Sequence, residues 1–363
     1  MAEEIIVDIE RCFPAGSVIR ADFRLDLTAG STTILFGPSG AGKTTVLRAI
    51  AGLERPDRGT IRFGGDVWLD TSQHCNLPPE VRKVGLLFQD YALFPHLTIR
   101  QNIEYGLHQF QKTDRRRISD ETMQVFEITE LADRRPSEIS GGQAQRVALA
   151  RAVAPQPRIL LLDEPLAALD VPTRTRMRTE LRRLLKRVGI PSLLVTHDRA
   201  EAITLGQQIV VMSDGTVRQI GPVDEVFRRP ADTTVALAVG VESVLDGVVA
   251  GVQSGLAKIH VGLFAVTAVA PEGCRCGQRV LVCIRAEDVT LQPVGPRAES
   301  ARNHLAGRIE AVESDGAVER VTIDCGFRLV AMITRDAREE LGLAVGGHII
   351  ASVKATAVHL IPL

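Results

Sequence analysis

A complete phosphate-binding loop of the pattern G-x-x-x-x-G-K-[ST] occupies residues 37–45. The segment 31–36 before it is strand-like, the segment 46–51 after it is helix-like, and Gly52 is a helix terminator. Glycines let consecutive backbone N–H groups turn inward around phosphate oxygens, and the following helix directs its positive end at the same anion. The loop therefore predicts a strand–loop–helix unit of an α/β sheet that binds a nucleoside triphosphate. We expect the nucleotide to contact Gly37, Pro38, Ser39, Gly40, Ala41, Gly42, Lys43, Thr44 and Thr45.

Phosphoryl transfer requires a cation, a metal site and a base, and the sequence offers candidates for each. Lys43 is expected to reach the β- and γ-phosphates, and the Thr44 hydroxyl is expected to bind Mg²⁺. The aliphatic run 159–162 predicts a strand buried in a parallel sheet, which delivers the next two residues to the ligand-binding edge. Those residues are Asp163, a predicted Mg²⁺ ligand, and Glu164, the candidate general base for the attacking water.

Two more polar residues follow strand-like segments. Gln89 comes after residues 84–88 and can offer its amide to Mg²⁺ or to the attacking water. His197 comes after residues 192–196 and can form a hydrogen bond with the γ-phosphate. Either residue alone is more often structural, so their order relative to the loop and the acidic pair makes them catalytic candidates.

Three further motifs resemble those of ATP-binding cassette (ABC) ATPases. Residues 140–143 resemble the family signature, residues 166–170 resemble its D-loop, and residues 196–198 resemble its switch histidine. The motifs follow the order and spacing of the family over roughly residues 5–235. Beyond the phosphate loop, the resemblance assigns nucleotide contacts to Phe13, Ser140, Gly141, Gly142, Gln143 and Asp170.

The resemblance implies a RecA-like α/β core with an antiparallel β subdomain and a helical subdomain at about residues 90–155. It implies ATP and Mg²⁺ as cofactors, with adenine stacked on Phe13. It also implies a homodimer in which each ATP lies between the phosphate loop of one subunit and Ser140–Gly142 of the other. Donors at a helix start suit that position because they complete the shell around the γ-phosphate.

The composition changes near Arg229 and Pro230, and we expect a domain of residues 1–235 followed by one of residues 236–363. The second domain contains an internal repeat, at about 242–293 and 300–361, with several short alternating segments in each copy. We expect an all-β domain of two small OB-type barrels.

The second repeat resembles domains that bind molybdate and tungstate. A small dianion needs several hydrogen-bond donors and some positive charge, because an unpaired buried charge is costly. The candidate donors are Ser300, Arg302, Asn303, Thr334, Lys354 and Thr356. The alternative is that the tail only holds the dimer together.

The favoured function is the ATPase subunit of a membrane importer for molybdate or tungstate, supplied indirectly by an extracellular oxyanion-binding protein. Importers of sulfate or thiosulfate, ferric iron or polyamine are alternatives, as are a soluble ABC ATPase acting on DNA or ribosomes and an oxyanion store. By the family resemblance, Tyr91, Leu93 and Phe94 are expected to form the groove for the permease, with core packing as the alternative.

Composition sets the expected location. The chain has no run of eighteen apolar residues, begins with an acidic segment and carries six scattered cysteines. These features favour a cytoplasmic protein with reduced thiols, peripheral on the inner face of the cell membrane. A net charge of −1 gives no general affinity for polyanions, and we expect no nucleic-acid partner.

Overall fold

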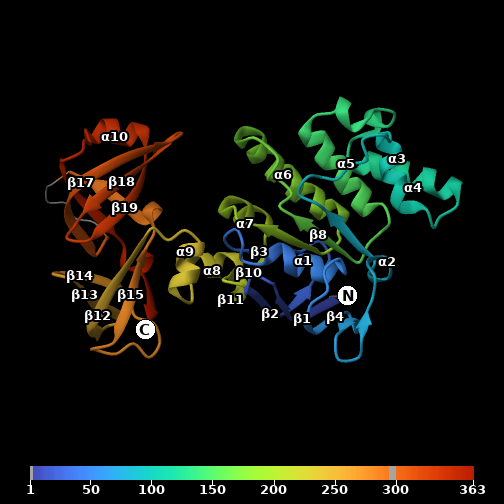
Figure 1. The fold of residues 1–363 in the computed structure, drawn as a ribbon. Coiled ribbons are helices and arrows are strands. Elements are labelled where there is room, and N and C mark those ends of the chain that lie inside the picture. The colour runs from blue at the N-terminus through green and yellow to red at the C-terminus, as the bar shows by residue number, and fades with distance from the viewer. Residues whose placement is uncertain (1–2, 294–299) are drawn as a thin grey trace. The chain divides into compact units, whose positions relative to one another are not determined.

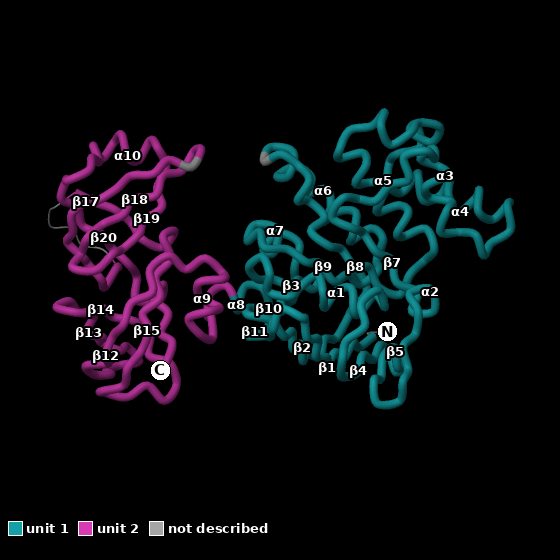
Figure 2. The backbone as a smooth tube through the Cα atoms, viewed as in Figure 1, with its two compact units in different colours: residues 1–226 teal, residues 227–363 magenta. Residues whose placement is uncertain are grey.

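The computed structural model describes residues 3–293 and 300–363 (Figure 1). The chain forms two compact units, residues 1–226 and 227–363 (Figure 2). The boundary predicted after residue 235 falls inside helix α9 (Thr233–Ala238) of the second unit.

The first unit is built on one sheet of eleven strands in the order β6-β5-β4-β1-β2-β11-β10-β3-β9-β8-β7. Its parallel strands are β3 (Thr32–Phe36), β7 (Val84–Leu87), β8 (Ile159–Asp163), β9 (Ser192–Thr196) and β10 (Gln208–Ser213). The others are β1 (Glu3–Cys12), β2 (Val18–Leu27), β4 (Arg58–Phe63), β5 (Asp66–Asp70), β6 (Cys75–Asn76) and β11 (Thr216–Pro222). Strands β3, β8 and β9 are buried along their whole length, as expected for aliphatic strands of a parallel sheet. Their carboxyl ends therefore meet at one edge, where ligands bind in open α/β sheets.

Four helices of this unit begin at short polar residues that cap free backbone N–H groups. Thr98 and Ser140 form capping boxes, and Asp170 and Asp198 accept from the third residue of their helices. The helices are α1 (Lys43–Ala51), α2 (Pro79–Arg82), α3 (Ile99–Glu104), α4 (Lys112–Val125), α5 (Gly141–Val153), α6 (Val171–Val188), α7 (Arg199–Leu205) and α8 (Val223–Arg228). Between β7 and β8 the chain also contains short 3₁₀ turns at Tyr105–Leu107, Thr129–Leu131 and Pro136–Glu138. Helices α3, α4 and α5 lie together (Figure 1), within the segment predicted as the helical subdomain.

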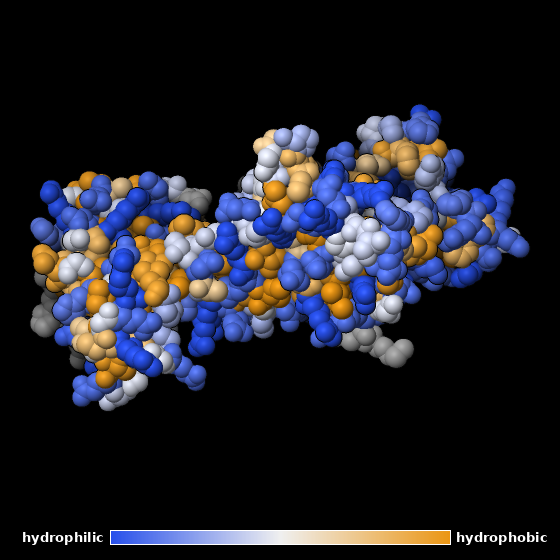
Figure 3. All heavy atoms as spheres, turned by 60° about the horizontal axis from the view of Figure 1, so that its bottom comes forward, coloured by the Kyte–Doolittle hydropathy of each residue, from blue (hydrophilic) through white to orange (hydrophobic). Residues whose placement is uncertain are grey.

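Within the described ranges, the helices are all too short or too polar to cross a lipid bilayer. The face drawn in Figure 3 carries hydrophilic and hydrophobic residues in small alternating groups on both units.

The second unit consists mainly of two antiparallel five-stranded sheets, β14-β13-β12-β15-β21 and β16-β20-β17-β18-β19. The strands are β12 (Ser243–Gln253), β13 (Leu256–Val261), β14 (Phe264–Val269), β15 (Arg279–Ile284), β16 (Val289–Gln292), β17 (Asn303–Asp315), β18 (Val318–Asp324), β19 (Arg328–Thr334), β20 (His348–Val353) and β21 (His359–Pro362). Helix α10 (Arg335–Leu341) and 3₁₀ turns at Ala286–Asp288 and Ala355–Ala357 connect them. The expected β fold of the carboxy-terminal region is confirmed.

The two repeats exchange their last strands. Strand β16 of the first repeat pairs with β20 of the second, and β21 of the second repeat pairs with β15 of the first. Apolar residues of both sheets form one continuous core. The repeats predicted as separate barrels at 242–293 and 300–361 are therefore interlocked, because a shared core lets each sheet take its fifth strand from the other repeat.

Two glycines occupy similar places in the two predicted repeats. Gly247 precedes a β-bulge in β12, and Gly307 precedes one in β17. A Cβ at either glycine would lie 2.5 Å from an isoleucine methyl, that of Ile259 or Ile323 on the neighbouring strand. Each sheet thus needs a glycine where its longest strand bends over the core.

Candidate functional site

The phosphate loop connects β3 to α1, and its conformation requires glycine. Gly37, Gly40 and Gly42 have φ values of 153°, 81° and 93°. A Cβ on Gly37 would lie 2.1 Å from the carbonyl oxygen of Met212, and one on Gly42 would lie 2.8 Å from the side chain of Ile19. The loop therefore keeps its backbone N–H groups accessible to an anion at the start of α1.

Lys43 is the first residue of α1, and its side chain curls back over the loop. The ammonium donates hydrogen bonds to the carbonyl oxygens of Gly37 and Pro38, at 2.9 and 2.8 Å. Burial lowers the pKa of Lys43, and the nearby Glu164 and Asp163 carboxylates partly oppose this shift. The ammonium thus lies in the loop that the sequence assigned to the phosphates.

Thr44 and Asp163 converge from opposite sides of the site. The Thr44 hydroxyl donates to Oδ1 of Asp163 at 2.9 Å, which joins the start of α1 to the end of β8. Burial raises the pKa of Asp163, and the hydrogen bond from Thr44 and nearby cations oppose the rise. A carboxylate and a hydroxyl oxygen placed together beside a phosphate loop are the hard oxygen donors that Mg²⁺ prefers, so these residues fit the ion.

Glu164 has a left-handed backbone, with φ of 44°. Its N–H donates to the carbonyl of Val195 at 3.1 Å, because β8 and β9 are parallel neighbours. The same pairing brings His197 close, and its Nδ1 lies 3.0 Å from Oε1 of Glu164. A carboxylate only accepts, so Nδ1 carries the proton in this contact. Donating to a γ-phosphate from Nε2 then requires the imidazolium.

Gln89 lies two residues beyond the end of β7, which pairs in parallel with β8. Its side chain is exposed. The topology therefore places Gln89 at the same sheet edge as the acidic pair. Its contact with Mg²⁺ or water stays a prediction.

The signature residues form the amino-terminal turn of α5. Ser140 and Gln143 bond each other's backbone N–H groups in a capping box, at 3.4 and 2.9 Å. Added Cβ atoms on Gly141 and Gly142 would approach Leu169 and Met177 at 3.3 and 3.2 Å. The turn is therefore packed between the D-loop and α6, with Ser140 exposed.

Asp170 and Phe13 occupy structural positions in this unit. Asp170 caps α6 by accepting from Thr173 N at 3.2 Å, and hydrogen bonds from the side chain and the backbone of Thr173 lower the pKa of Asp170. Phe13 is half-buried in the β1–β2 connection, and the guanidinium carbon of Arg11 lies 5.6 Å from its ring centroid. Nucleotide contacts at both residues stay predictions.

One predicted docking residue is misplaced. Tyr91 is 7% exposed, and its hydroxyl donates to the carbonyl of Pro165 at 3.3 Å. At Tyr91 the alternative of core packing is therefore the one that the structure shows. Leu93 and Phe94 are half-buried, and the Phe94 ring packs on Tyr105 with centroids 4.4 Å apart.

The structure does not bring the six predicted oxyanion ligands together. Asn303 opposes Val353 at one end of β17, whereas Thr334 opposes Val318 near the other end. Asn303 is buried, accepts from Thr267 N at 2.6 Å, and donates to the carbonyls of Thr267 and Val353 at 2.9 and 3.1 Å. Its amide is thus used in holding strands. The residues at the Asn303 end that remain exposed are Ser300, Arg302, Lys354 and Thr356.

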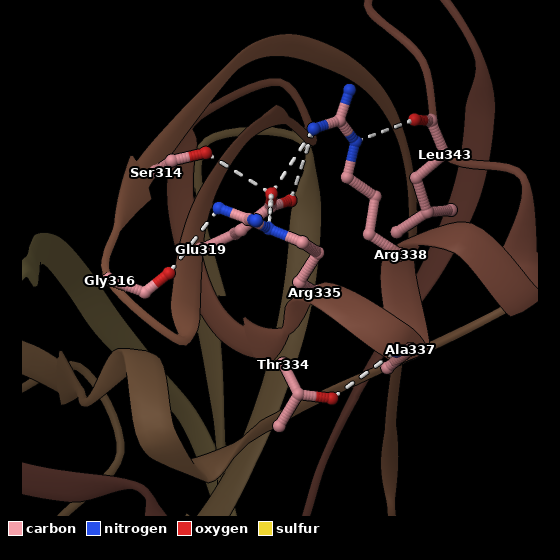
Figure 4. A network of polar contacts seen from close by, with 8 residues as sticks. All are labelled: Ser314, Gly316, Glu319, Thr334, Arg335, Ala337, Arg338 and Leu343. Carbon is pink, nitrogen blue, oxygen red and sulfur yellow. Dashed lines mark hydrogen bonds and ion pairs between the residues drawn. The ribbon is translucent and has the colours of Figure 1, made fainter.

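Thr334 caps α10 by accepting from Ala337 N at 3.2 Å (Figure 4). Beside it, Arg335 and Arg338 turn toward the buried carboxylate of Glu319, with nearest distances of 3.9 and 3.2 Å. Ser314 donates to the same carboxylate at 3.2 Å. The positive charge in this pocket is therefore already paired with a carboxylate of the chain.

In the first unit, two residues of α5 that the sequence did not single out contact the segments around Glu164 and Gln89. These residues are Gln145 and Arg151. Gln145 Nε2 donates to the carbonyl of Pro165 at 3.1 Å, and Arg151 donates to the carbonyls of Tyr91 and Ala92 at 2.8 and 2.7 Å. A polar residue between apolar neighbours on the buried face of α5 was the available signal for Gln145.

Comparison with known proteins decides the family. The model of the ABC transporter family matches residues 21–167, and the model of the TOBE domain matches residues 299–360. A molybdate/tungstate import ATP-binding protein of Pyrococcus horikoshii is 37% identical over 94% of this chain and 95% of its own length. The chain belongs to the ABC transporter family.

Relatives of this ABC protein are named for different substrates. A molybdenum import ATP-binding protein of Rhodospirillum rubrum is 39% identical over 89% of this chain and 90% of the relative. A spermidine/putrescine import ATP-binding protein of Ruegeria pomeroyi is 43% identical over 74% of this chain and 72% of the relative. The predicted family and activity are confirmed: the chain is an ABC ATPase, which binds and hydrolyses ATP.

Proposed function

We propose that this ABC ATPase drives a membrane importer for molybdate or tungstate. Similarity to the molybdate/tungstate protein of Pyrococcus horikoshii extends over 94% of the chain, tail included, and this is the observation that carries the proposal. The more identical polyamine relative of Ruegeria pomeroyi matches 74%. The chain then works as a homodimer at the cytoplasmic face of the membrane. Its partners are permease subunits that receive the oxyanion from an extracellular binding protein.

The proposed hydrolysis uses the residues at the sheet edge. Lys43 and the loop amides bind the β- and γ-phosphates, and Thr44, Asp163 and Gln89 are the proposed Mg²⁺ ligands. A Mg²⁺ ion held by these residues would supply positive charge beside the phosphate oxygens. Glu164 accepts a proton from water as the water oxygen bonds to the γ-phosphorus and the bond to the bridging oxygen of ADP breaks.

His197 has two proposed tasks in this site. Its contact with Oε1 of Glu164 orients the carboxylate before reaction. As an imidazolium it also supplies a donor to the γ-phosphate. Ser140–Gly142 of the partner subunit close the other side of the ATP.

Uptake measurements test the substrate. Cells that depend on this chain and its permease should accumulate molybdate and tungstate, and Lys43→Ala should abolish that uptake because nucleotide binding is lost. Spermidine and sulfate serve as controls. If Lys43→Ala abolishes the uptake of spermidine and leaves the uptake of molybdate unchanged, the chain is assigned to polyamine import instead.

We also propose that the tail binds the transported oxyanion and restrains transport when cytoplasmic supply is ample. The exposed residues Arg302 and Lys354 supply charge at the Asn303 end of β17, with hydroxyl donors from Ser300 and Thr356. Restraint follows by linkage if the anion binds better to a form in which the ATP sites are open.

The test compares ATPase activity of the assembled transporter with and without molybdate, for wild type and Lys354→Ala. Molybdate should slow the wild type, and the variant should resist. Equal activity in all four measurements, with no molybdate bound to the full chain in a calorimetric titration, would leave the tail as a scaffold.

A further inference from the structure

The carbonyl oxygen of Pro165 accepts two hydrogen bonds from buried side chains. Pro165 directly follows Glu164, and the donors are the hydroxyl of Tyr91 at 3.3 Å and the amide of Gln145 at 3.1 Å. Tyr91 lies in the loop after β7 and Gln145 lies on α5. Three segments distant in sequence therefore meet at one backbone atom.

The backbone on both sides of this junction is unusual. Glu164, Tyr91 and Ala92 have φ values of 44°, 61° and 44°. A left-handed conformation is costly for residues other than glycine and persists only where the surroundings fix it. Arg151 supplies part of that constraint, because its guanidinium donates to the carbonyls of Tyr91 and Ala92 at 2.8 and 2.7 Å.

Hydrogen bonds to the carbonyl of a proline restrict the backbone more than they would at another residue. The ring of Pro165 fixes the φ of that residue, so ψ is the only free backbone dihedral. Two hydrogen bonds to the carbonyl oxygen fix ψ as well. That oxygen belongs to the peptide that joins Pro165 to Leu166. With φ and ψ of Pro165 both fixed, this peptide is held rigidly against the peptide that joins Glu164 to Pro165, and the position of the Glu164 Cα, from which the side chain projects, is set with it.

The buried amide of Gln145 makes one hydrogen bond as a donor, but its oxygen accepts none. The side chain is 0% exposed, and among the residues that the structure describes its Oε1 has no hydrogen-bond partner. An unpaired buried acceptor has lost its hydrogen bonds to water without replacement, which is unfavourable. An apolar side chain of similar shape would avoid that cost but would not hold the Pro165 carbonyl.

We propose that Tyr91 and Gln145 are positioning residues that hold the carboxylate of Glu164 in its reactive orientation through the carbonyl of Pro165. The proposal rests on the proposed role of Glu164 as general base. Helix α5 begins at the Ser140 turn, and the Tyr91 loop begins at Gln89. A displacement of either element therefore reaches the backbone of the base directly.

Steady-state kinetics of the full chain test the proposal with two nearly isosteric variants. Tyr91→Phe and Gln145→Met each remove one donor and keep the volume of the side chain. We expect kcat to fall roughly 5- to 20-fold in each, with KM for ATP within about twofold of wild type, because binding groups are untouched. Tyr105→Phe is the matched control: it removes the hydroxyl of the other tyrosine, which is 59% exposed, and should leave both constants unchanged.

A double-mutant cycle separates positioning from a general structural effect. Glu164→Gln alone should slow hydrolysis by roughly two orders of magnitude. In that background Tyr91→Phe should slow it by less than about twofold further, because the group that Tyr91 positions is already gone. Thermal unfolding of each variant shows whether lost activity merely follows lost folded protein.

The outcomes of the two proposals differ. If Glu164→Gln hydrolyses ATP at a near-normal rate, the general-base assignment fails. If Glu164→Gln is slow while Tyr91→Phe and Gln145→Met hydrolyse ATP at the wild-type rate, the positioning role is overturned and the general-base assignment remains. The same conclusion follows if either substitution slows hydrolysis by the same factor in the Glu164→Gln background as in wild type.

Discussion

Arg82 shows how a single charged residue can be a structural centre. It is 0% exposed, and all five of its N–H donors go to uncharged oxygens: Leu77 O, Ala49 O, Ile50 O, Trp68 O and Asn76 Oδ1. Burial lowers the pKa of Arg82 to about 10, which still leaves it protonated at neutral pH. The cation lies at the carboxyl end of α1, where it stabilises the helix dipole.

Arg82→Lys should destabilise the first unit by roughly 2–6 kcal/mol. An ammonium has three donors, so at least two buried acceptors lose their partners, at about 1–3 kcal/mol each. Urea unfolding followed by fluorescence of Trp68, the single tryptophan of the chain, measures the change beside the substituted residue. Arg62→Lys on the exposed surface is the control and should shift stability by less than about 0.5 kcal/mol. Equal unfolding midpoints for both variants would contradict this account.

Single functional residues could be predicted from the sequence where they belong to a short local motif. Lys43, Thr44, Asp163 and Glu164 were named from short patterns, and the sheet gathers them at one edge. Tyr91 was misjudged because its burial depends on a carbonyl 74 positions away, which no local pattern encodes.

At the scale of secondary-structure elements, one buried polar residue of strand β17 holds neighbouring strands together. Asn303 opens the strand, and its amide bonds both backbone groups of Thr267 on β14 and the carbonyl of Val353 on β20. Strand β14 is an edge strand of the other sheet. The side chain therefore joins the two sheets where their strands are not paired with each other.

Asn303→Ala should loosen β14 and the start of β17. Three hydrogen bonds disappear and buried partners are left unpaired, a loss of about 2–3 kcal/mol, which corresponds to faster amide exchange by roughly 30- to 150-fold. Hydrogen exchange at Thr267, followed by mass spectrometry, reads this directly. Arg302→Ala, next in the chain and exposed, should leave that exchange unchanged. Unaltered protection of Thr267 in Asn303→Ala would exclude the clamp.

The sequence predicts which segments form helices and strands, from periodicity and capping residues. It does not predict which strands pair with each other. The short alternating segments of the tail predicted strands, and the described residues of the tail form β12 to β21. Which repeat each final strand joins depends on a core shared by both sheets, and that information is spread over the whole unit. Thr334 was read as a ligand for a similar reason, since its role is to cap a helix that begins one residue later.

On the scale of the assembly, the exposed Ser140 turn predicts composite ATP sites. Mixing subunits that carry Lys43→Ala with subunits that carry Ser140→Arg gives heterodimers in which one site holds both lesions and the other holds neither. Some ATPase activity should therefore return, relative to either variant alone. The check is activity before and after subunit exchange, with exchange verified by differently tagged chains. A mixture as inactive as its parents after verified exchange would count against sites shared between subunits.

The exchange of β16 and β21 has a consequence for synthesis on the ribosome. The sheet that begins with β12 gains its last strand only when residues 359–362 pair with β15. Until those residues leave the exit tunnel, the apolar strand β15, buried at all but its first residue, has a free edge. A nascent chain stalled before residue 359 would thus expose a pairing edge from its first repeat, and it should be a substrate for chaperones or a seed for aggregation.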